Sequence, residues 1–149
     1  MRDGLGFNNT IRYRLYDSNG NLKDDKITHN QTQNNALTQV IDALDDGTCS
    51  HIITMAIGIG SGQAATDTAL SSISSFETGA AVSATQSGTP EDTVEFSATF
   101  TAGGSWTITE AGLFTSANAA SWMMFYDDSI STSMTSGDTL QIDWTVSVS

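Results

Sequence analysis

The side chains best suited to acid–base, nucleophilic or metal chemistry are few in this 149-residue sequence. Histidine occurs only at His29 and His51, and Cys49 is the single cysteine. These three residues fall short of a zinc ligand set, and one cysteine cannot form an internal disulfide. Neither histidine has a catalytic partner that the sequence identifies, and no G-x-S-x-G nucleophile motif is present. We therefore predict a non-enzymatic protein with no catalytic residues and with both histidines on its surface.

One glycine-rich stretch has the spacing of a cofactor loop. Residues 60–65 read Gly-Ser-Gly-Gln-Ala-Ala, follow a predicted strand and match the relaxed dinucleotide pattern G-x-G-x-x-A. In that pattern the glycines let the backbone approach a pyrophosphate at the start of a helix within a βαβ unit. Here residues 66–72 are a weak helix start, and no parallel unit follows. We interpret the stretch as a flexible turn and predict no cofactor.

Acidic residues in loops are the remaining candidates for metal binding. Three acidic pairs occur, Asp45-Asp46, Glu91-Asp92 and Asp127-Asp128, and loop carboxylates of this kind bind calcium. Residues 17–21 begin like a calcium loop, but Gly20 comes two positions early and no Glu occupies the twelfth position. We interpret that stretch as a hairpin turn and predict no metal site.

Charge is distributed unevenly along the chain. The net charge is −12, and all five basic residues lie within the first 26 positions: Arg2, Arg12, Arg14, Lys23 and Lys26. Residues 27–149 carry 13 carboxylates and no Lys or Arg. Proteins hold phosphate backbones and anionic lipid surfaces through Lys and Arg, so we expect neither nucleic acid nor membrane as a partner. No run approaches the ~18 apolar residues that a membrane-spanning helix needs.

Alternating apolar and polar residues dominate the chain and predict strands with one buried face. The alternation is clearest at 93–101 and 140–148. Between the first of these and residues 105–110, the Gly103-Gly104 pair predicts a hairpin connection. The predicted fold class is therefore mainly β, an antiparallel β-sandwich.

We expect residues 1–149 to form a single domain that begins with a hairpin at about residues 11–28. Residues 11–16 alternate, and the Asn-Gly pair at 19–20 favours a tight turn because both residues tolerate positive φ. This hairpin carries most of the basic residues and is a candidate anchoring arm.

One packed α-helix is predicted at about residues 34–46. Its apolar residues recur at spacings of three and four: Ala36, Leu37, Val40, Ile41 and Leu44. Gly47 suits a C-terminal cap, whereas Asp42, Asp45 and Asp46 oppose the helix dipole, which favours cations at that end. We therefore expect packing to stabilise this helix.

The run from Trp122 to Tyr126 is apolar on both faces of a strand, which indicates either a central strand or a subunit contact. Trp122, Met123 and Phe125 are accordingly candidate partner-contact residues. If Trp106, Trp122 or Tyr126 were exposed, they could instead stack on sugars, as in a receptor- or carbohydrate-binding module. On inward positions the same aromatic residues belong to the core.

Five segments together resemble a group of small virion proteins of tailed phages and archaeal tailed viruses. They read I-G-I-G-S-G and A-A-T-D-T-A-L at 57–62 and 64–70, V-E-F-S-A-T-F at 94–100, T-I-T-E-A-G-L-F at 107–114, and G-D-T-L-Q-I-D-W-T-V at 137–146. The ordered set is similar to that group from about residue 11 to residue 148. The basic residue that the group commonly has between the G-L-F segment and the closing segment has no counterpart here.

The resemblance implies a structural component of a virion, assembled in the host cytoplasm. Its expected partners are further copies of itself and the major capsid or tail proteins, and the expected place is the head, as a decoration or turret. A tail-tip or tail-fibre protein is the alternative. An interaction with an acidic shell or tail surface would suit Arg2, Arg12 and Arg14, so these three are also candidate partner-contact residues.

Overall fold

Five antiparallel strands form the first sheet, which we call sheet A. The computed structural model describes residues 6–45, 47, 50–71, 80–88, 92–115 and 122–148. Sheet A has the order β2-β1-β12-β7-β6. Its strands are β1 (Phe7–Tyr16), β2 (Leu22–Thr28), β6 (Ser83–Ser87), β7 (Thr93–Thr101) and β12 (Thr139–Val148). The predicted alternation is observed along β12, where Leu140, Ile142, Trp144 and Val146 are buried and the residues between them are partly exposed.

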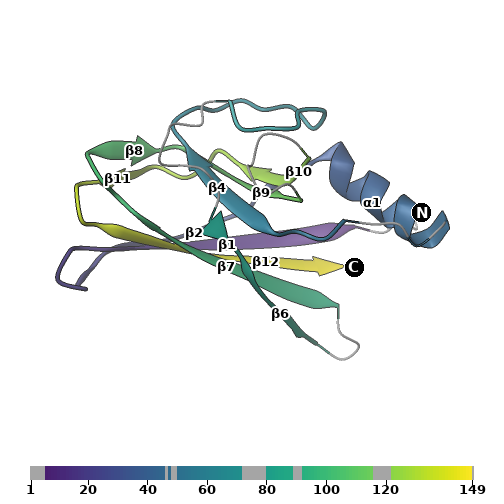
Figure 1. The fold of residues 1–149 in the computed structure, drawn as a ribbon, viewed down its shortest axis with the longest axis horizontal. Coiled ribbons are helices and arrows are strands. Elements are labelled where there is room, and N and C mark those ends of the chain that lie inside the picture. The colour runs from purple at the N-terminus through teal and green to yellow at the C-terminus, as the bar shows by residue number, and fades with distance from the viewer. Residues whose placement is uncertain are drawn as a thin grey trace.

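Shorter strands form the second layer. Sheet B has the order β3-β10-β9-β4-β5, and a separate pair joins β11 to β8. The bounds are β3 (Gln31–Thr32), β4 (Thr54–Gly58), β5 (Ala80–Ala81), β8 (Trp106–Ile108), β9 (Glu110–Phe114), β10 (Met123–Asp127) and β11 (Thr132–Met134). Figure 1 shows β4, β9 and β10 lying over β1, β12 and β7. All pairings are antiparallel, so the predicted antiparallel sandwich is confirmed.

The core lies between these two sheets. One cluster of buried apolar residues contains Ile11 and Trp144 from sheet A together with Met55, Leu113 and Phe125 from sheet B. Trp144 is completely buried. Burying a large aliphatic side chain stabilises a fold by about 1.5–3 kcal/mol, so this cluster is what holds the two sheets together.

The N-terminal hairpin is part of sheet A. β1 pairs with β12 along ten residues, from Phe7 opposite Val148 to Tyr16 opposite Thr139. β2 pairs with the other side of β1 and lies at the sheet edge. The inner side chains of β1 belong to the core, so only β2 and the outer face of the hairpin are available to anchor the protein to a partner. The anchoring role stays a prediction.

The predicted hairpin across Gly103-Gly104 is wrong. β7 pairs with β12 and β6, whereas β8 pairs with β11, so the chain leaves sheet A after Thr101. The backbone of Ala102 explains the crossing. Its N–H donates to Asp138 O at 2.9 Å, and its carbonyl accepts from Gly137 N at 2.8 Å, which ties the connection to the turn before β12.

Helix α1 (Asn34–Asp45) matches the predicted span and lies at one end of the sandwich against β10 (Figure 1). Gly47 has φ +75° and donates its N–H to Asp42 O at 3.2 Å, as expected of a C-terminal cap. The packing differs from the expectation, because Ala36 is the buried residue of the helix while Leu37, Ile41 and Leu44 are exposed. α1 thus rests on the sandwich through small side chains, and its larger apolar ones point outward.

Candidate interaction surface

An apolar groove opens where α1 meets the end of sheet A. It has a volume of about 860 Å³. Its walls include Val40 and Ala43 of α1, Val94 of β7, and Val146 and Val148 of β12. The strands of sheet A are up to ten residues long, whereas β4, β9 and β10 have five residues each. At about 3.3 Å per residue, the shorter sheet cannot cover the longer one, so apolar side chains at its end stay open.

A stripe of three large apolar side chains continues this groove along the outside of α1. We call Leu37, Ile41 and Leu44 the α1 stripe; they are 47%, 63% and 79% exposed. At 100° per residue these positions lie on one face of the helix, and the half-buried Val40 lies between them and the groove. Groove and stripe therefore form one continuous apolar surface.

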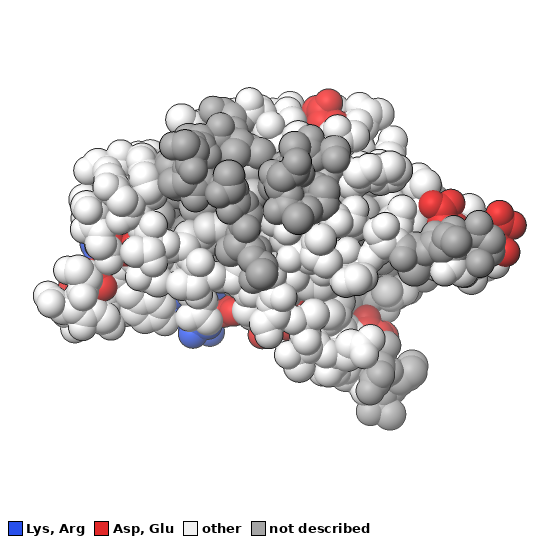
Figure 2. All heavy atoms as spheres, in the orientation of Figure 1, with Lys and Arg blue, Asp and Glu red and all other residues white. Residues whose placement is uncertain are grey.

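The surroundings of this apolar surface are acidic. Asp42 and Asp45 lie on α1, Asp92 lines the groove, and neither α1 nor the groove contains Lys or Arg. Figure 2 shows acidic atoms at the end of the molecule where α1 lies. On the helix, Asp45 falls on the side of the stripe away from Val40. Asp42 and Asp45 thus border the stripe, whereas Asp92 lies in the wall of the groove.

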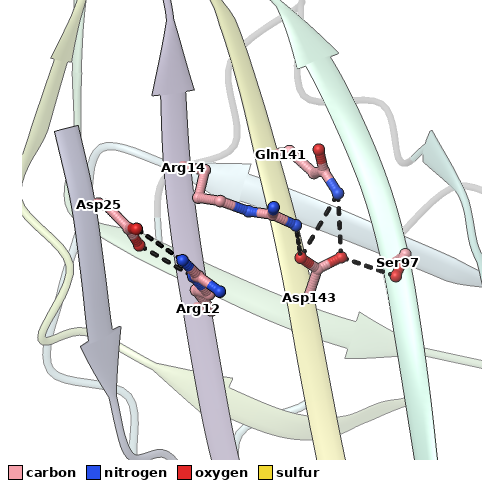
Figure 3. Close-up of polar contacts among 6 residues, drawn as sticks. All are labelled: Arg12, Arg14, Asp25, Ser97, Gln141 and Asp143. Atoms are coloured by element: carbon pink, nitrogen blue, oxygen red, sulfur yellow. Dashed lines mark hydrogen bonds and ion pairs between the residues drawn. The ribbon is translucent and has the colours of Figure 1, made fainter. Parts of the chain in front are cut away.

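Two predicted contact residues, Arg12 and Arg14, lie on the outer face of sheet A (Figure 3). Arg12 donates to both carboxylate oxygens of Asp25, at 3.0 and 2.7 Å. This hydrogen bond, together with the charge of Arg12, lowers the pKa of Asp25. Arg14 donates to Asp143, which also accepts from Ser97 Oγ at 2.8 Å. Both guanidinium groups are therefore paired within the chain.

Asp143 is the central residue of this polar face. Burial raises its pKa, but the hydrogen bonds from Ser97, Arg14 and Gln141 outweigh burial, so the pKa is lowered overall. The carboxylate is thus held in its charged form. This arrangement orders side chains on three neighbouring strands, β1, β12 and β7 (Figure 3).

The remaining predicted contact residues are separated by the structure. Met123 and Phe125 are buried, and their strand β10 is an inner strand of sheet B, as the central-strand alternative predicted. Trp122 is 48% exposed and has φ +60°, a conformation that is strained for a bulky residue. Arg2 lies outside the described residues. The structure therefore brings none of Met123, Phe125 and Trp122 into one surface with Arg12 and Arg14.

The sequence reasoning missed the burial of three carboxylates: Glu110, Asp138 and Asp127, which it had counted among loop residues and which lies at the end of β10. Glu110 is completely buried and accepts hydrogen bonds from Gly60 N at 3.2 Å, Ser71 N at 3.2 Å, Ser71 Oγ at 3.1 Å and Tyr126 OH at 3.1 Å. Burial is the main cause that raises the pKa of Tyr126. Glu110 thus fastens the loop 59–71 to sheet B. A Glu inside an otherwise apolar strand was the signal that could have revealed it.

Asp127 connects the two sheets in the same way. It is 2% exposed and accepts from Tyr13 OH in β1, from Thr28 Oγ1 at 2.7 Å and from Ser129 N at 3.0 Å. Burial and then the Asp127 charge raise the pKa of Tyr13 well above its usual range. The carboxylate holds β10 against the N-terminal hairpin.

Asp138, the third buried carboxylate, pairs with a cation. Its carboxylate accepts from Lys23 Nζ at 2.6 Å and from Thr135 N at 2.8 Å. These two contacts lower its pKa. All three buried acids therefore have hydrogen-bond donors around them, as buried polar groups in folded proteins generally do.

Neither metal ligands nor a spanning helix were found in the described ranges. Those residues contain no group of three or more His, Cys, Asp or Glu placed to hold a metal ion. Within the same ranges, no helix has the length and apolar character to cross a membrane. Comparison with protein-family models, with curated proteins and with solved structures gave no match.

Proposed function

We propose that this protein is a structural component of a tailed-virus particle. More specifically, we propose that it is a head decoration or turret protein that assembles as an oligomer on the capsid. It carries out no reaction in this role. A single observation carries the proposal: Glu110 and Asp138, two buried acids of the resembling segments, hold distant parts of the fold together.

Glu110 is the clearest case. It belongs to the T-I-T-E-A-G-L-F segment, and its carboxylate binds Gly60 of the G-I-G-S-G segment and Ser71, which directly follows A-A-T-D-T-A-L. Two segments that are distant in sequence are thus joined by one buried acid. Asp138 of the G-D-T-L segment likewise accepts a hydrogen bond from Lys23, which lies on β2. Motifs of this kind specify a scaffold, and the exposed apolar surface beside α1 gives that scaffold a place to bind partners.

Locating the protein on the particle tests the proposal. Gold-labelled antibody against the protein, imaged on purified particles by electron microscopy, should mark the capsid surface. Label at the tail end would instead support the alternative of a tail-tip or tail-fibre protein. Absence of the protein from purified, infectious particles would contradict both.

A receptor- or carbohydrate-binding module is the second candidate, and Trp122 favours it. Among the described aromatic side chains, this is the one more than a third exposed, and exposed Trp rings stack on apolar ligand faces. The Trp122→Ala variant should then lose binding to a glycan array. The Trp106→Phe variant should keep it, because the side chain of Trp106 packs against the core. Equal binding by the two variants would exclude the module.

A further inference from the structure

We propose that the edge of sheet A formed by β6 is a docking site for an extended segment of another protein, which adds to the sheet as a further strand and alternates apolar with basic residues. This inference concerns a binding surface and does not rest on the proposed function. Its evidence is the contrast between the two edges of sheet A, the apolar groove on the inner side of β6 and the charge on its outer side.

The two edge strands of sheet A differ in how they are protected against pairing with another chain. β2 carries four charged residues in a row, at positions 23–26, and its pairing with β1 shifts register between Leu15 and Tyr16. Charged side chains and bulges are features by which proteins block strand addition at a sheet edge. β6 reads Ser-Ala-Thr-Gln-Ser, without charge or proline, and pairs regularly with β7 over all five residues. Of the two edges, β2 is therefore protected and β6 is not.

The backbone of β6 is available for a further strand. All five of its residues are exposed, and Figure 1 shows β6 at the outer margin of sheet A, beyond β7. Within the described part of the chain, the backbone groups of residues 83–87 pair with β7 alone. Val82, just before the strand, donates its N–H to Ile53 O at 3.2 Å, which fixes the start of β6. β6 is thus an ordered template, and an incoming strand bears most of the ordering cost.

The inner side of β6 borders the apolar groove. Ala84 and Gln86 line the groove together with Phe96 and Val94, the β7 residues directly opposite them. Successive side chains of a strand point to opposite faces of the sheet. Every second side chain of a strand added to β6 therefore projects over the groove. Burial of apolar surface favours apolar side chains at these positions.

The outer side next to β6 is acidic. Glu95 lies opposite Thr85, is exposed, and forms no ion pair with a Lys or Arg of the described ranges. Neighbouring strands lie about 4.8 Å apart, so the backbone of an added strand is about 9.6 Å from that of Glu95. A long basic side chain and the Glu side chain together span this gap. The outer residues of the occupant are therefore Lys or Arg.

Charge also separates a basic partner from a second copy of this chain. A second copy brings a net charge of −12 and, at its own β6, a strand without Lys or Arg. Like-charged surfaces repel, whereas a basic segment is attracted. The occupant is therefore a segment of another protein.

The first test measures the binding of synthetic peptides to the full chain by isothermal titration calorimetry. Lys-Val-Lys-Val-Lys-Val-Lys has the proposed alternation, and Val-Val-Val-Lys-Lys-Lys-Lys has the same composition and charge without it. The alternating peptide should bind at least about tenfold more tightly, because only alternation puts valines over the groove and lysines beside Glu95. Replacing its lysines by Glu should weaken binding by about tenfold or more.

N-methylated peptides show whether the main chain carries the binding. Alternate residues of a strand direct their N–H groups to the same edge, so the valine amides point to one edge and the lysine amides to the other. We expect methylation of one of these two sets to weaken binding about tenfold or more, and methylation of the other set to change it by about twofold at most.

Two matched variants of the protein locate the site. Thr85→Lys gives the β6 edge a long charged side chain of the kind that protects β2, and should weaken binding of the alternating peptide about tenfold or more. Thr99→Lys makes the same change at an exposed β7 position beyond the residues that pair with β6. It should change the binding by about twofold at most. Circular dichroism shows whether each variant is folded.

The inference is overturned if the alternating peptide does not bind, if it binds no better than the block peptide, or if both sets of N-methyl groups act equally. Equal weakening by Thr85→Lys and Thr99→Lys would also overturn it. Dimers of the chain alone that Thr85→Lys dissociates in sedimentation velocity would make a second copy the occupant and contradict the proposal. None of these results depends on whether virus particles carry the protein, so the proposed function stands or falls separately.

Discussion

Replacement of Asp127 by Ala is expected to weaken the fold strongly, although no catalytic function is assigned to the residue. The carboxylate is 2% exposed and accepts hydrogen bonds from side chains of both sheets. Its removal takes the carboxylate acceptor from the hydroxyl of Tyr13, which is 1% exposed and keeps only the hydroxyl of Thr28 as a neighbour. An unsatisfied buried donor costs about 1–3 kcal/mol.

The total magnitude follows from the other donors. Thr28 and Ser129 are less buried than Tyr13 and can turn toward water, so each adds about 1 kcal/mol or less. Asp127→Ala should therefore lower the free energy of unfolding by about 2–5 kcal/mol. A loss of about 3 kcal/mol corresponds to a Tm lower by about 6–12 °C for a domain of this size.

The assay is urea unfolding followed by tryptophan fluorescence, since Trp144 is completely buried. A double-mutant cycle with Tyr13→Phe should give a coupling energy of about 1–3 kcal/mol, because the double variant has no orphaned hydroxyl. Asp128→Ala is the matched control: that residue is exposed and accepts a hydrogen bond from Gly62 N at 3.1 Å, so its cost should stay below about 1 kcal/mol. An Asp127→Ala variant as stable as this control, or an additive cycle, would refute the reasoning.

Two further changes test the loop and the acid response. Gly60→Ala should destabilise the protein by about 1–3 kcal/mol, because a Cβ there would lie 1.8 Å from Ser71 Oγ. Gly103→Ala is the control and should cost little, because its Cβ would meet its nearest neighbour at 3.9 Å. Equal melting temperatures of the two variants would be inconsistent with this packing. The Lys23 hydrogen bond lowers the pKa of Asp138 from 3.8, so its stabilisation is complete above that value and is lost as the pH falls through the lowered pKa. Urea midpoints measured from about pH 6 to pH 2.5 should fall most steeply below about pH 4, and Lys23→Met should flatten that fall; an unchanged slope would show that the pair does not contribute.

Elements with a local signal were predictable from the sequence. The strand at 140–148 shows its buried face in the order of its residues, and the helix at Asn34–Asp45 shows its spacing of three and four. Gly47 marks the helix end because a positive φ favours glycine there. The strand, the helix and the helix end each depend on residues that are close together in the sequence, so no knowledge of the rest of the chain is needed.

Pairing partners and burial were harder to predict because they depend on distant residues. A Gly-Gly connection allows a hairpin, yet the chain after Thr101 crosses to a different sheet because Ala102 is held by residues near β12. Glu110 looks like a misplaced acid in its strand until the loop 59–71 supplies its donors. No local pattern contains that information.

The amino-acid sequence alone determined the charge segregation, the strand periodicity and the amphipathic helix, since composition and short-range spacing are properties of the chain itself. Only the tertiary structure decided which side of that helix is covered. α1 packs against β10 through Ala36, and Leu37, Ile41 and Leu44 are exposed. The spacing of apolar residues defines an apolar side of the helix, but which side is covered depends on where a distant strand packs, and no local pattern contains that information.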